Sequence, residues 1–113
     1  MNFNIKKDQL IDPLYLAKEL IKFPSETPRD EGALFFVEEV LNILGFKCFR
    51  MPSGEIDGMG KEALVNNLYA KTGRGKTLCF AGHTDVVPAG NKANWISAPY
   101  EAKVHAGMLI GRG

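Results

Sequence analysis

A histidine and an aspartate separated by one residue form the pattern in this sequence that is best suited to chemistry. They lie in Gly82–Asp85, directly after the apolar run Leu78–Ala81. Side chains two residues apart in an extended segment point to the same side, so His83 and Asp85 can face one cavity. A carboxylate commonly accepts the second ring N–H of a metal-bound histidine and orients the ring. The pair therefore allows a metal site with His83 as one ligand.

The same pair also has a purely structural interpretation. His83 can end a strand while Asp85 makes an Asx turn, and a single histidine is not a metal site. The spacing alone leaves both interpretations open. The position favours function, because ligands of open α/β sheets bind beyond the carboxyl ends of the strands.

Two helices are expected before this site. Asp12 and Pro13 are suited to the N-cap and the first turn of a helix that must end before Pro24. Asp30 can cap a second helix, and Gly45 fits the position just after its end. Apolar residues at steps of three and four predict the buried stripe of that second helix: Leu34, Val37, Leu41 and Leu44.

Three strands are expected after the helices. Lys47–Met51 and Asn67–Lys71 have extended patterns, with a surface loop over Pro52–Asn66 between them and a turn at Thr72–Gly75. Leu78–Ala81 is continuously apolar, which is typical of a strand covered on both faces. This order of elements predicts an α/β fold with a layered sheet.

Length and composition indicate at most one ordinary globular domain. The chain has 113 residues, of which 45% are hydrophobic and 24% charged, so disordered and collagen-like classes are excluded. A net charge of +1 gives no reason to expect a nucleic-acid partner, and the apolar runs are too short for a transmembrane helix. The N-terminus lacks the apolar stretch of a signal peptide, and two cysteines are too few for a disulfide scaffold. We therefore expect a reduced, cytoplasmic setting.

The residues around His83 strongly resemble the first zinc-ligand motif of the zinc aminoacylase and carboxypeptidase family. The matching run is Leu78–Gly90. Order and spacing agree with the family at four further places: Leu20–Pro28, Leu44–Phe46, Trp95 with Pro99–Glu101, and Gly107–Gly113. The resemblance covers nearly the whole chain and implies the N-terminal portion of a zinc-peptidase-like layered α/β catalytic domain, with an incomplete sheet.

What the resemblance implies is a metal-dependent amide hydrolase. Residue by residue, His83 matches a zinc ligand, Asp85 matches the catalytic-site aspartate that orients it, and Trp95 and Pro99 match a structural loop. The family enzymes hold two zinc ions, with cobalt possible, act on a small-molecule substrate and form homodimers. The fuller match around Phe80–Pro88 favours N-succinyl-LL-2,6-diaminopimelate over acetylornithine. The implied products are succinate and LL-2,6-diaminopimelate, in lysine and diaminopimelate biosynthesis.

Other metal-binding residues of the family pattern have no counterpart in this sequence. The family's bridging aspartate follows Gly-Arg-Gly, whereas Gly111–Gly113 are the last residues here. We therefore expect residues 1–113 to be a partial catalytic domain without the lid and dimerisation domain, inactive alone, with a C-terminal partner piece if the gene is split. A non-catalytic remnant and a binding module that uses the His83 loop stay open as alternatives. The incomplete sheet predicts an exposed edge, and hence aggregation or weakly cooperative unfolding.

Five further side chains carry both a structural and a functional interpretation. Cys79 and Cys48 are expected to be buried small hydrophobic residues rather than reactive thiolates. His105 is expected at the exposed end of a strand. We expect Trp95 to fill space beneath its loop rather than stack on a substrate, and Arg112 to pair with protein acids rather than with a substrate carboxylate.

Overall fold

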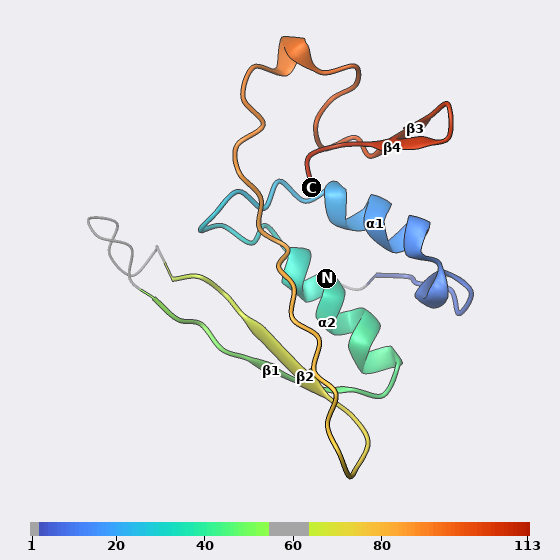
Figure 1. The fold of residues 1–113 in the computed structure, drawn as a ribbon, viewed down its shortest axis with the longest axis vertical. Helices are drawn as coiled ribbons and strands as arrows, with labels where there is room; N and C mark the ends of the chain where they lie inside the picture. Colours follow the sequence, from blue (N-terminus) through green and yellow to red (C-terminus); the bar gives the residue numbers. More distant parts are fainter. Residues whose placement is uncertain (1–2, 55–63) are drawn as a thin grey trace.

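Two helices pack side by side, and a two-stranded antiparallel ribbon lies along the second of them (Figure 1). The computed structural model describes residues 3–54 and 64–113, so part of the loop expected over Pro52–Asn66 lies outside the described residues. The helices and strands are α1 (Pro13–Ile21), α2 (Ala33–Ile43), β1 (Lys47–Arg50), β2 (Leu68–Lys71), β3 (Lys103–His105) and β4 (Met108–Ile110), with short 3-10 turns at Gln9–Ile11 and Lys92–Asn94. Within the described ranges, no helix has the length and apolar character needed to cross a membrane.

The first helix has the ends that its sequence predicts. The Asp12 side chain caps it by accepting the backbone N–H of Leu14 at 2.9 Å, and Pro13 occupies the first turn. Proline is tolerated there because that turn has no carbonyl acceptor for its missing N–H. The helix ends at Ile21, before Pro24. These predictions are confirmed.

The second helix begins close to the predicted Asp30, but its N-cap position is Gly32, two residues later. Asp30 accepts the backbone N–H of Leu34 at 2.9 Å. At the other end Gly45 has a φ of 85°, which favours glycine, and the Phe46 N–H donates to the Leu41 carbonyl at 2.9 Å. This is the Schellman arrangement, in which a left-handed residue satisfies the last helical carbonyls.

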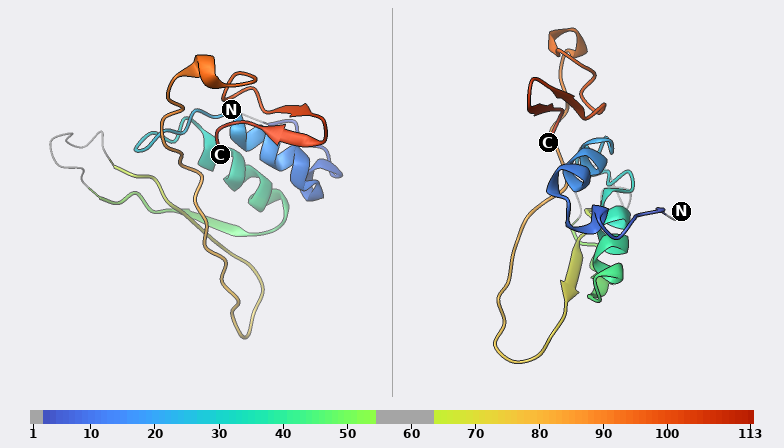
Figure 2. Two further views of the ribbon diagram at one scale, coloured as in Figure 1. Left: turned by 45° about the horizontal axis from the view of Figure 1, so that its top comes forward. Right: turned by 90° about the vertical axis from the view of Figure 1, so that its right-hand side faces the viewer.

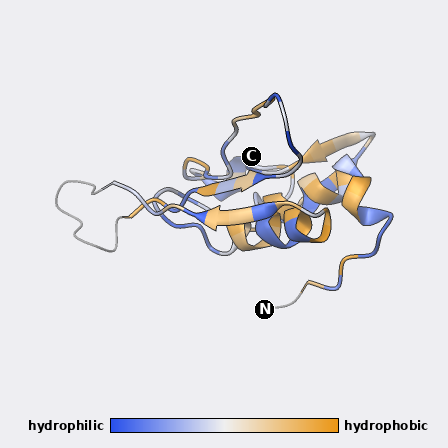
Figure 3. Ribbon diagram, turned by 90° about the horizontal axis from the view of Figure 1, so that it is seen from below, coloured by the Kyte–Doolittle hydropathy of each residue, from blue (hydrophilic) through white to orange (hydrophobic). Residues whose placement is uncertain are grey.

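The hydrophobic core lies between the two helices and the segment that precedes α1. Its buried members are Leu10, Phe36 and Val40. Half-buried apolar residues pack around them: Phe3, Ile5, Tyr15, Leu16, Leu20 and Phe23. Phe3 meets Phe36 edge to face with ring centroids 5.1 Å apart, a favourable aromatic geometry. Figure 3 shows apolar residues along both helices.

The buried stripe predicted for α2 is wrong. Leu34, Val37 and Leu41 are half-buried and line an open cleft, and Leu44 is 45% exposed. The helix is apolar on two sides, and the side with Phe36 packs into the core. Periodicity identified one apolar face correctly, but it does not say which of two such faces the described residues cover.

The strands predicted at Lys47–Met51 and Asn67–Lys71 are present as β1 and β2. They pair antiparallel, from Lys47 opposite Lys71 to Arg50 opposite Leu68. A second hairpin, β3 with β4, turns through Ala106 and Gly107, both with positive φ, as a two-residue hairpin turn requires. The fold is α/β, with two helices and short antiparallel strands in a small, incomplete assembly. His105 is exposed at the end of β3, as predicted.

The strand predicted at Leu78–Ala81 is absent. Leu78 is 79% exposed and Phe80 88% exposed, and no backbone hydrogen bond joins this run to any other described residue. Figure 2 shows the segment after β2 looping outward from the helices. A strand covered on both faces needs neighbouring strands, and in the described ranges β2 pairs only with β1. The burial predicted for Cys79 is therefore wrong as well, whereas Cys48 is half-buried.

Candidate functional site

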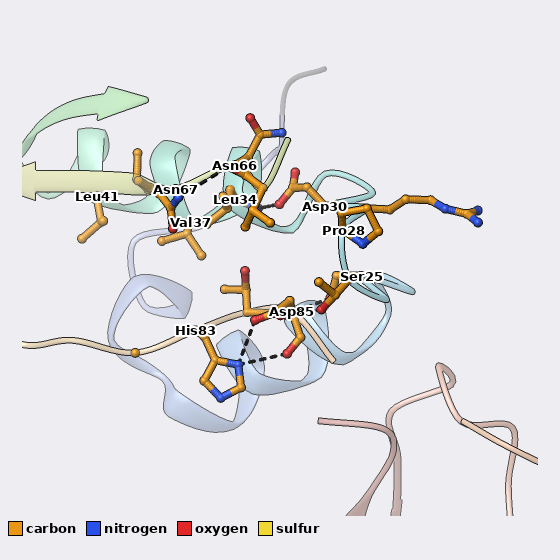
Figure 4. A pocket seen from close by; sticks show the side chains of 16 residues that line it. Ser25, Pro28, Asp30, Leu34, Val37, Leu41, Asn66, Asn67, His83 and Asp85 are labelled. Atoms are coloured by element: carbon orange, nitrogen blue, oxygen red, sulfur yellow. Dashed lines mark hydrogen bonds and ion pairs between the residues drawn. The ribbon is translucent and has the colours of Figure 1, made fainter. Parts of the chain in front are cut away.

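His83 and Asp85 lie at the polar end of an open cleft (Figure 4). The cleft has a volume of about 350 Å³. Leu34, Val37 and Leu41 of α2 form an apolar wall, and residues that precede α2 and β2 complete the lining. An apolar wall with a few convergent polar groups is the usual character of a small-molecule site.

Among the described residues, the hydrogen-bond partner of the His83 imidazole is Asp85. Its Nδ1 lies 3.0 Å from Asp85 Oδ1 and 3.0 Å from the Asp85 carbonyl oxygen. Both partners are acceptors, so the ring N–H is assigned to Nδ1. In the neutral ring this leaves the lone pair on Nε2. The His83 side chain is 82% exposed, so Nε2 is accessible to a ligand.

The residues Pro24–Pro28 form a connector between α1 and α2. Two hydroxyl groups of this connector hold the segment that carries His83 and Asp85. Ser25 Oγ donates to the carbonyl oxygen of Thr84 at 2.7 Å. Thr27 Oγ1 donates to Asp85 Oδ2 at 2.5 Å. Both carboxylate oxygens of Asp85 are thus engaged, one by a hydroxyl and the other by the imidazole.

The backbone of the connector fixes the same segment. The Val86 N–H donates to the Ser25 carbonyl at 2.9 Å, and the Thr27 N–H donates to the Val86 carbonyl at 3.3 Å, which makes a parallel bridge between Glu26 and Val86. On the opposite side of the connector, Tyr100 donates its hydroxyl to Glu26 Oε1 at 2.6 Å. Alternation along an extended backbone explains why residues 25 and 27 face the site while residue 26 faces away.

These contacts shift the protonation of two groups. The hydrogen bond from Thr27 lowers the pKa of Asp85, against an opposing effect of burial, and His83 lowers it further. Asp85 is therefore a carboxylate at neutral pH, the form that accepts the ring N–H. Burial, followed by the neighbouring Glu26, raises the pKa of Tyr100, so that phenol is protonated and able to donate.

The loop after the site packs against itself. Trp95 is half-buried and donates its indole N–H to the Ala89 carbonyl at 2.9 Å, in line with a space-filling role. Arg112 does not pair with an acid within the described ranges, and this expectation is wrong. Its guanidinium lies 5.0 Å from the centroid of the Trp95 ring, a cation–π contact. At Gly111 an added Cβ would overlap Ile21 Cγ2, so the chain approaches α1 more closely than a side chain allows.

The residues at the site fit one metal ligand and not a complete metal centre. His83 presents an exposed Nε2 with its other nitrogen already bonded to a carboxylate, which is how metal-binding histidines are usually held. Residues 3–54 and 64–113 contain no group of three His, Cys, Asp or Glu side chains that could hold an ion. A hydrolytic zinc site needs three protein ligands and an open position. The metal-ligand role of His83 and the catalytic role of Asp85 stay predictions.

Sequence reasoning missed the connector as part of the site. Pro24–Pro28 reads as a rigid link between two helices, and nothing local points to His83. The available signal is two hydroxyl residues, Ser25 and Thr27, placed two apart in an extended stretch. Their partners are 58 and 59 positions away in the chain, a pairing that local patterns do not reveal.

Known proteins similar to this chain are found over nearly its whole length. Residues 79–113 match peptidase family M20/M25/M40. The chain is 50% identical over 104 residues to a succinyl-diaminopimelate desuccinylase of Caulobacter sp. (strain K31), covering 91% of this chain and 24% of that protein. The enzymes of the same name from Rhodospirillum centenum and Ehrlichia canis are 52% and 45% identical, over 90% and 91% of this chain and 26% of each relative. The chain spans about a quarter of the length of these relatives. Over nearly its whole length it is thus similar to part of the succinyl-diaminopimelate desuccinylases, and its C-terminal residues 79–113, which include His83, match peptidase family M20/M25/M40.

Proposed function

We propose that residues 1–113 form the histidine-bearing part of the catalytic domain of a metal-dependent amide hydrolase, a succinyl-diaminopimelate desuccinylase. The observation that carries the proposal is the His83–Asp85 contact at the end of a cleft, in a chain about half identical to enzymes of that name. The proposed reaction converts N-succinyl-LL-2,6-diaminopimelate and water into succinate and LL-2,6-diaminopimelate. It belongs to lysine and diaminopimelate biosynthesis in the cytoplasm, in a homodimeric enzyme or one completed by a C-terminal partner piece.

The chain's own residues have distinct tasks in this proposal. His83 offers Nε2 as one ligand of a zinc site, which holds two ions in the complete enzyme and accepts cobalt. Asp85 fixes the ring by accepting the N–H of Nδ1. A bound divalent ion would polarise the scissile carbonyl and lower the pKa of water. The apolar side chains of α2 form a wall against which the methylene groups of a substrate can pack.

A non-catalytic binding role is the second candidate. It is favoured by the described residues themselves, which bring no third metal-binding side chain to His83 and Asp85. In that case the cleft would bind a small acylated amino acid without hydrolysing it. A deacetylase acting on acetylornithine is a further alternative with the same site chemistry, and the choice of substrate distinguishes it.

A chimera tests the proposal. The aligned segment of the Caulobacter sp. (strain K31) desuccinylase is replaced by this chain, and release of succinate and of acetate from the two substrates is measured with zinc or cobalt. We expect hydrolysis of the succinyl substrate in preference to acetylornithine, and no turnover by residues 1–113 alone. The change His83→Ala should abolish activity, whereas His105→Ala, an exposed histidine on β3, should not change it.

Two outcomes would overturn the proposal. One is a folded chimera that binds the succinyl substrate without hydrolysing it, which supports the binding role. The other is a His83→Ala chimera as active as its parent. Preferential hydrolysis of acetylornithine would replace the desuccinylase with the deacetylase.

A further inference from the structure

We propose that Thr27 is a positioning residue for His83, acting through the carboxylate of Asp85. Its hydroxyl holds one carboxylate oxygen so that the other stays on Nδ1 of the imidazole, which selects the tautomer whose lone pair lies on Nε2. The consequence for hydrolysis rests on the proposed function, whereas the effect on the imidazole does not require metal or substrate.

The first step is the state of the Asp85 carboxylate. Rotation about the terminal bond of an aspartate is soft, and the Asp85 side chain is 44% exposed. Packing therefore does little to fix the plane of the carboxylate. The hydrogen bond from Thr27 to Oδ2 does fix it, and places Oδ1 3.0 Å from His83 Nδ1. Charge-assisted hydrogen bonds of this kind are short and strong.

The second step is the orientation of the His83 ring. With 82% of its side chain exposed, His83 has few packing contacts to hold it. The interactions that orient it within the described ranges are the two contacts of Nδ1 with Asp85. In a neutral histidine, a hydrogen bond from one ring nitrogen to an acceptor decides which of the two nitrogens carries the proton. Loosening the carboxylate therefore loosens both the ring direction and the tautomer.

The third step is the support of Thr27 itself. The backbone N–H of Thr27 donates to the Val86 carbonyl. Two residues earlier, Ser25 is 2% exposed, and its hydroxyl donates to the Thr84 carbonyl. Glu26 between them is bonded to Tyr100. The Thr27 side chain is exposed, but the backbone that carries it is held by bonds on both sides of the connector.

Nuclear magnetic resonance of the 113-residue chain, without added metal, tests the effect directly. Two-bond ¹H–¹⁵N spectra above the histidine pKa report the tautomer of each imidazole. We expect His83 to be mainly the Nδ1–H form, and His105, which has no hydrogen bond to a carboxylate in the described part of the chain, to show a mixture of the two tautomers. Thr27→Val, which replaces the hydroxyl with a methyl group of similar size, should shift His83 toward the pattern of His105.

Matched variants separate positioning from a general loss of structure. Thr27→Ser retains the hydroxyl and should restore the wild-type tautomer. Thr72→Val makes the same chemical change at an exposed hydroxyl that donates to the Gly45 carbonyl. It should leave the His83 tautomer unchanged. An Nε2–H form of His83 in the wild-type chain, or an unchanged tautomer in Thr27→Val, would overturn the inference. If Thr27→Val does not fold, Thr27→Ser decides: loss of the Nδ1–H form in that variant contradicts the proposal.

The chimera supplies the second readout. Thr27→Val should weaken zinc binding by roughly tenfold, the lower end of the range for partners that orient metal ligands, with recovery in Thr27→Ser. A tautomer that responds to Thr27 in a chimera without desuccinylase activity would refute the proposed function and retain the positioning role. An active chimera whose His83 tautomer and zinc affinity do not change in Thr27→Val would support the proposed function and refute the positioning role of Thr27.

Discussion

Two neighbouring stretches of one segment have opposite environments. Leu78–Ala81 is apolar, exposed and without backbone hydrogen bonds to the rest of the described chain. Thr84–Val86, only two residues further on, is polar at its start and is tied to Ser25–Thr27 by two backbone and two side-chain hydrogen bonds. The candidate site is thus held by the connector and not by the strand that leads into it.

This difference separates two sources of order. A hydrogen-bonded loop needs only a partner of matching polarity, and residues 25–27 supply it. An apolar strand needs neighbours along both edges and cover on both faces, and the described elements do not provide them. A radius of gyration of 15.8 Å reflects this openness, because a compact chain of this length is expected near 13 Å, with approximate scaling. The predictions below test the contrast, beginning with the largest effect.

The largest expected effect compares two phenylalanines of opposite burial. Phe36 is 1% exposed and Phe80 88% exposed. Phe36→Ala leaves a cavity in the core and should lower the unfolding free energy by about 3–5 kcal/mol. Phe80→Ala should change it by less than about 0.5 kcal/mol, as for other surface positions. Urea unfolding followed by circular dichroism measures both.

The pair of variants is its own control, because each removes the same side chain. A loss of stability at Phe80 equal to that at Phe36 would show that Leu78–Ala81 is packed in solution. The contrast between the two stretches would then be wrong.

Local signals predicted the elements better than they predicted the layers. Asp12, Asp30 and Gly45 identified three helix ends, because caps are satisfied within a few residues of the chain. The strand at Leu78–Ala81 was wrong because burial of a strand depends on partners far away in sequence. The side of α2 that enters the core was wrong for the same reason: Phe36 and Leu34 are both apolar, and only the position of α1 decides between them.

The same limit explains how much of the site was predicted. The contact between His83 and Asp85 spans two residues and follows from extended geometry. The contact between Thr27 and Asp85 spans 58 positions, so it depends on how the connector crosses the end of this segment. Sequence therefore indicated the chemical pair, while its support became visible only in three dimensions.

An intermediate effect is expected in the alkylation rates of the two cysteines, Cys79 and Cys48. Cys79 is exposed within the open stretch. Cys48 on β1 is half-buried and donates to the Glu38 carbonyl, and burial followed by the nearby Glu38 carboxylate raises its pKa. Because the thiolate is the reactive form, Cys79 should react with iodoacetamide several-fold faster than Cys48. Mass spectrometry of partly alkylated protein gives both rates, with Cys79→Ser and Cys48→Ser as controls. Equal rates, or faster labelling of Cys48, would contradict the exposure of Leu78–Ala81.

The smallest expected effect concerns the acid titration of Asp85, which lies in the hydrogen-bonded stretch Thr84–Val86. The hydrogen bond from Thr27 lowers the pKa of Asp85 from its ordinary 3.8 in the folded chain. The folded state thus favours the carboxylate, so this contribution to stability is complete above the ordinary pKa and is lost as the pH falls through the lower folded value. Thr27→Val removes the largest cause of the shift and should raise the midpoint at which the Asp85 carboxyl carbon titrates by magnetic resonance.

The acid dependence of stability should follow the same sign. As the pH falls below the ordinary Asp pKa of 3.8, the wild-type chain should lose more unfolding free energy than Thr27→Val, because its Asp85 has the lower folded pKa. The difference is small, since the Asp85 side chain is 44% exposed and solvent screens its interactions. Thr72→Val should titrate like the wild type. If the Asp85 midpoint is the same with and without the Thr27 hydroxyl, the connector does not bond the carboxylate in solution. The contrast between Leu78–Ala81 and the hydrogen-bonded stretch Thr84–Val86 would then be wrong.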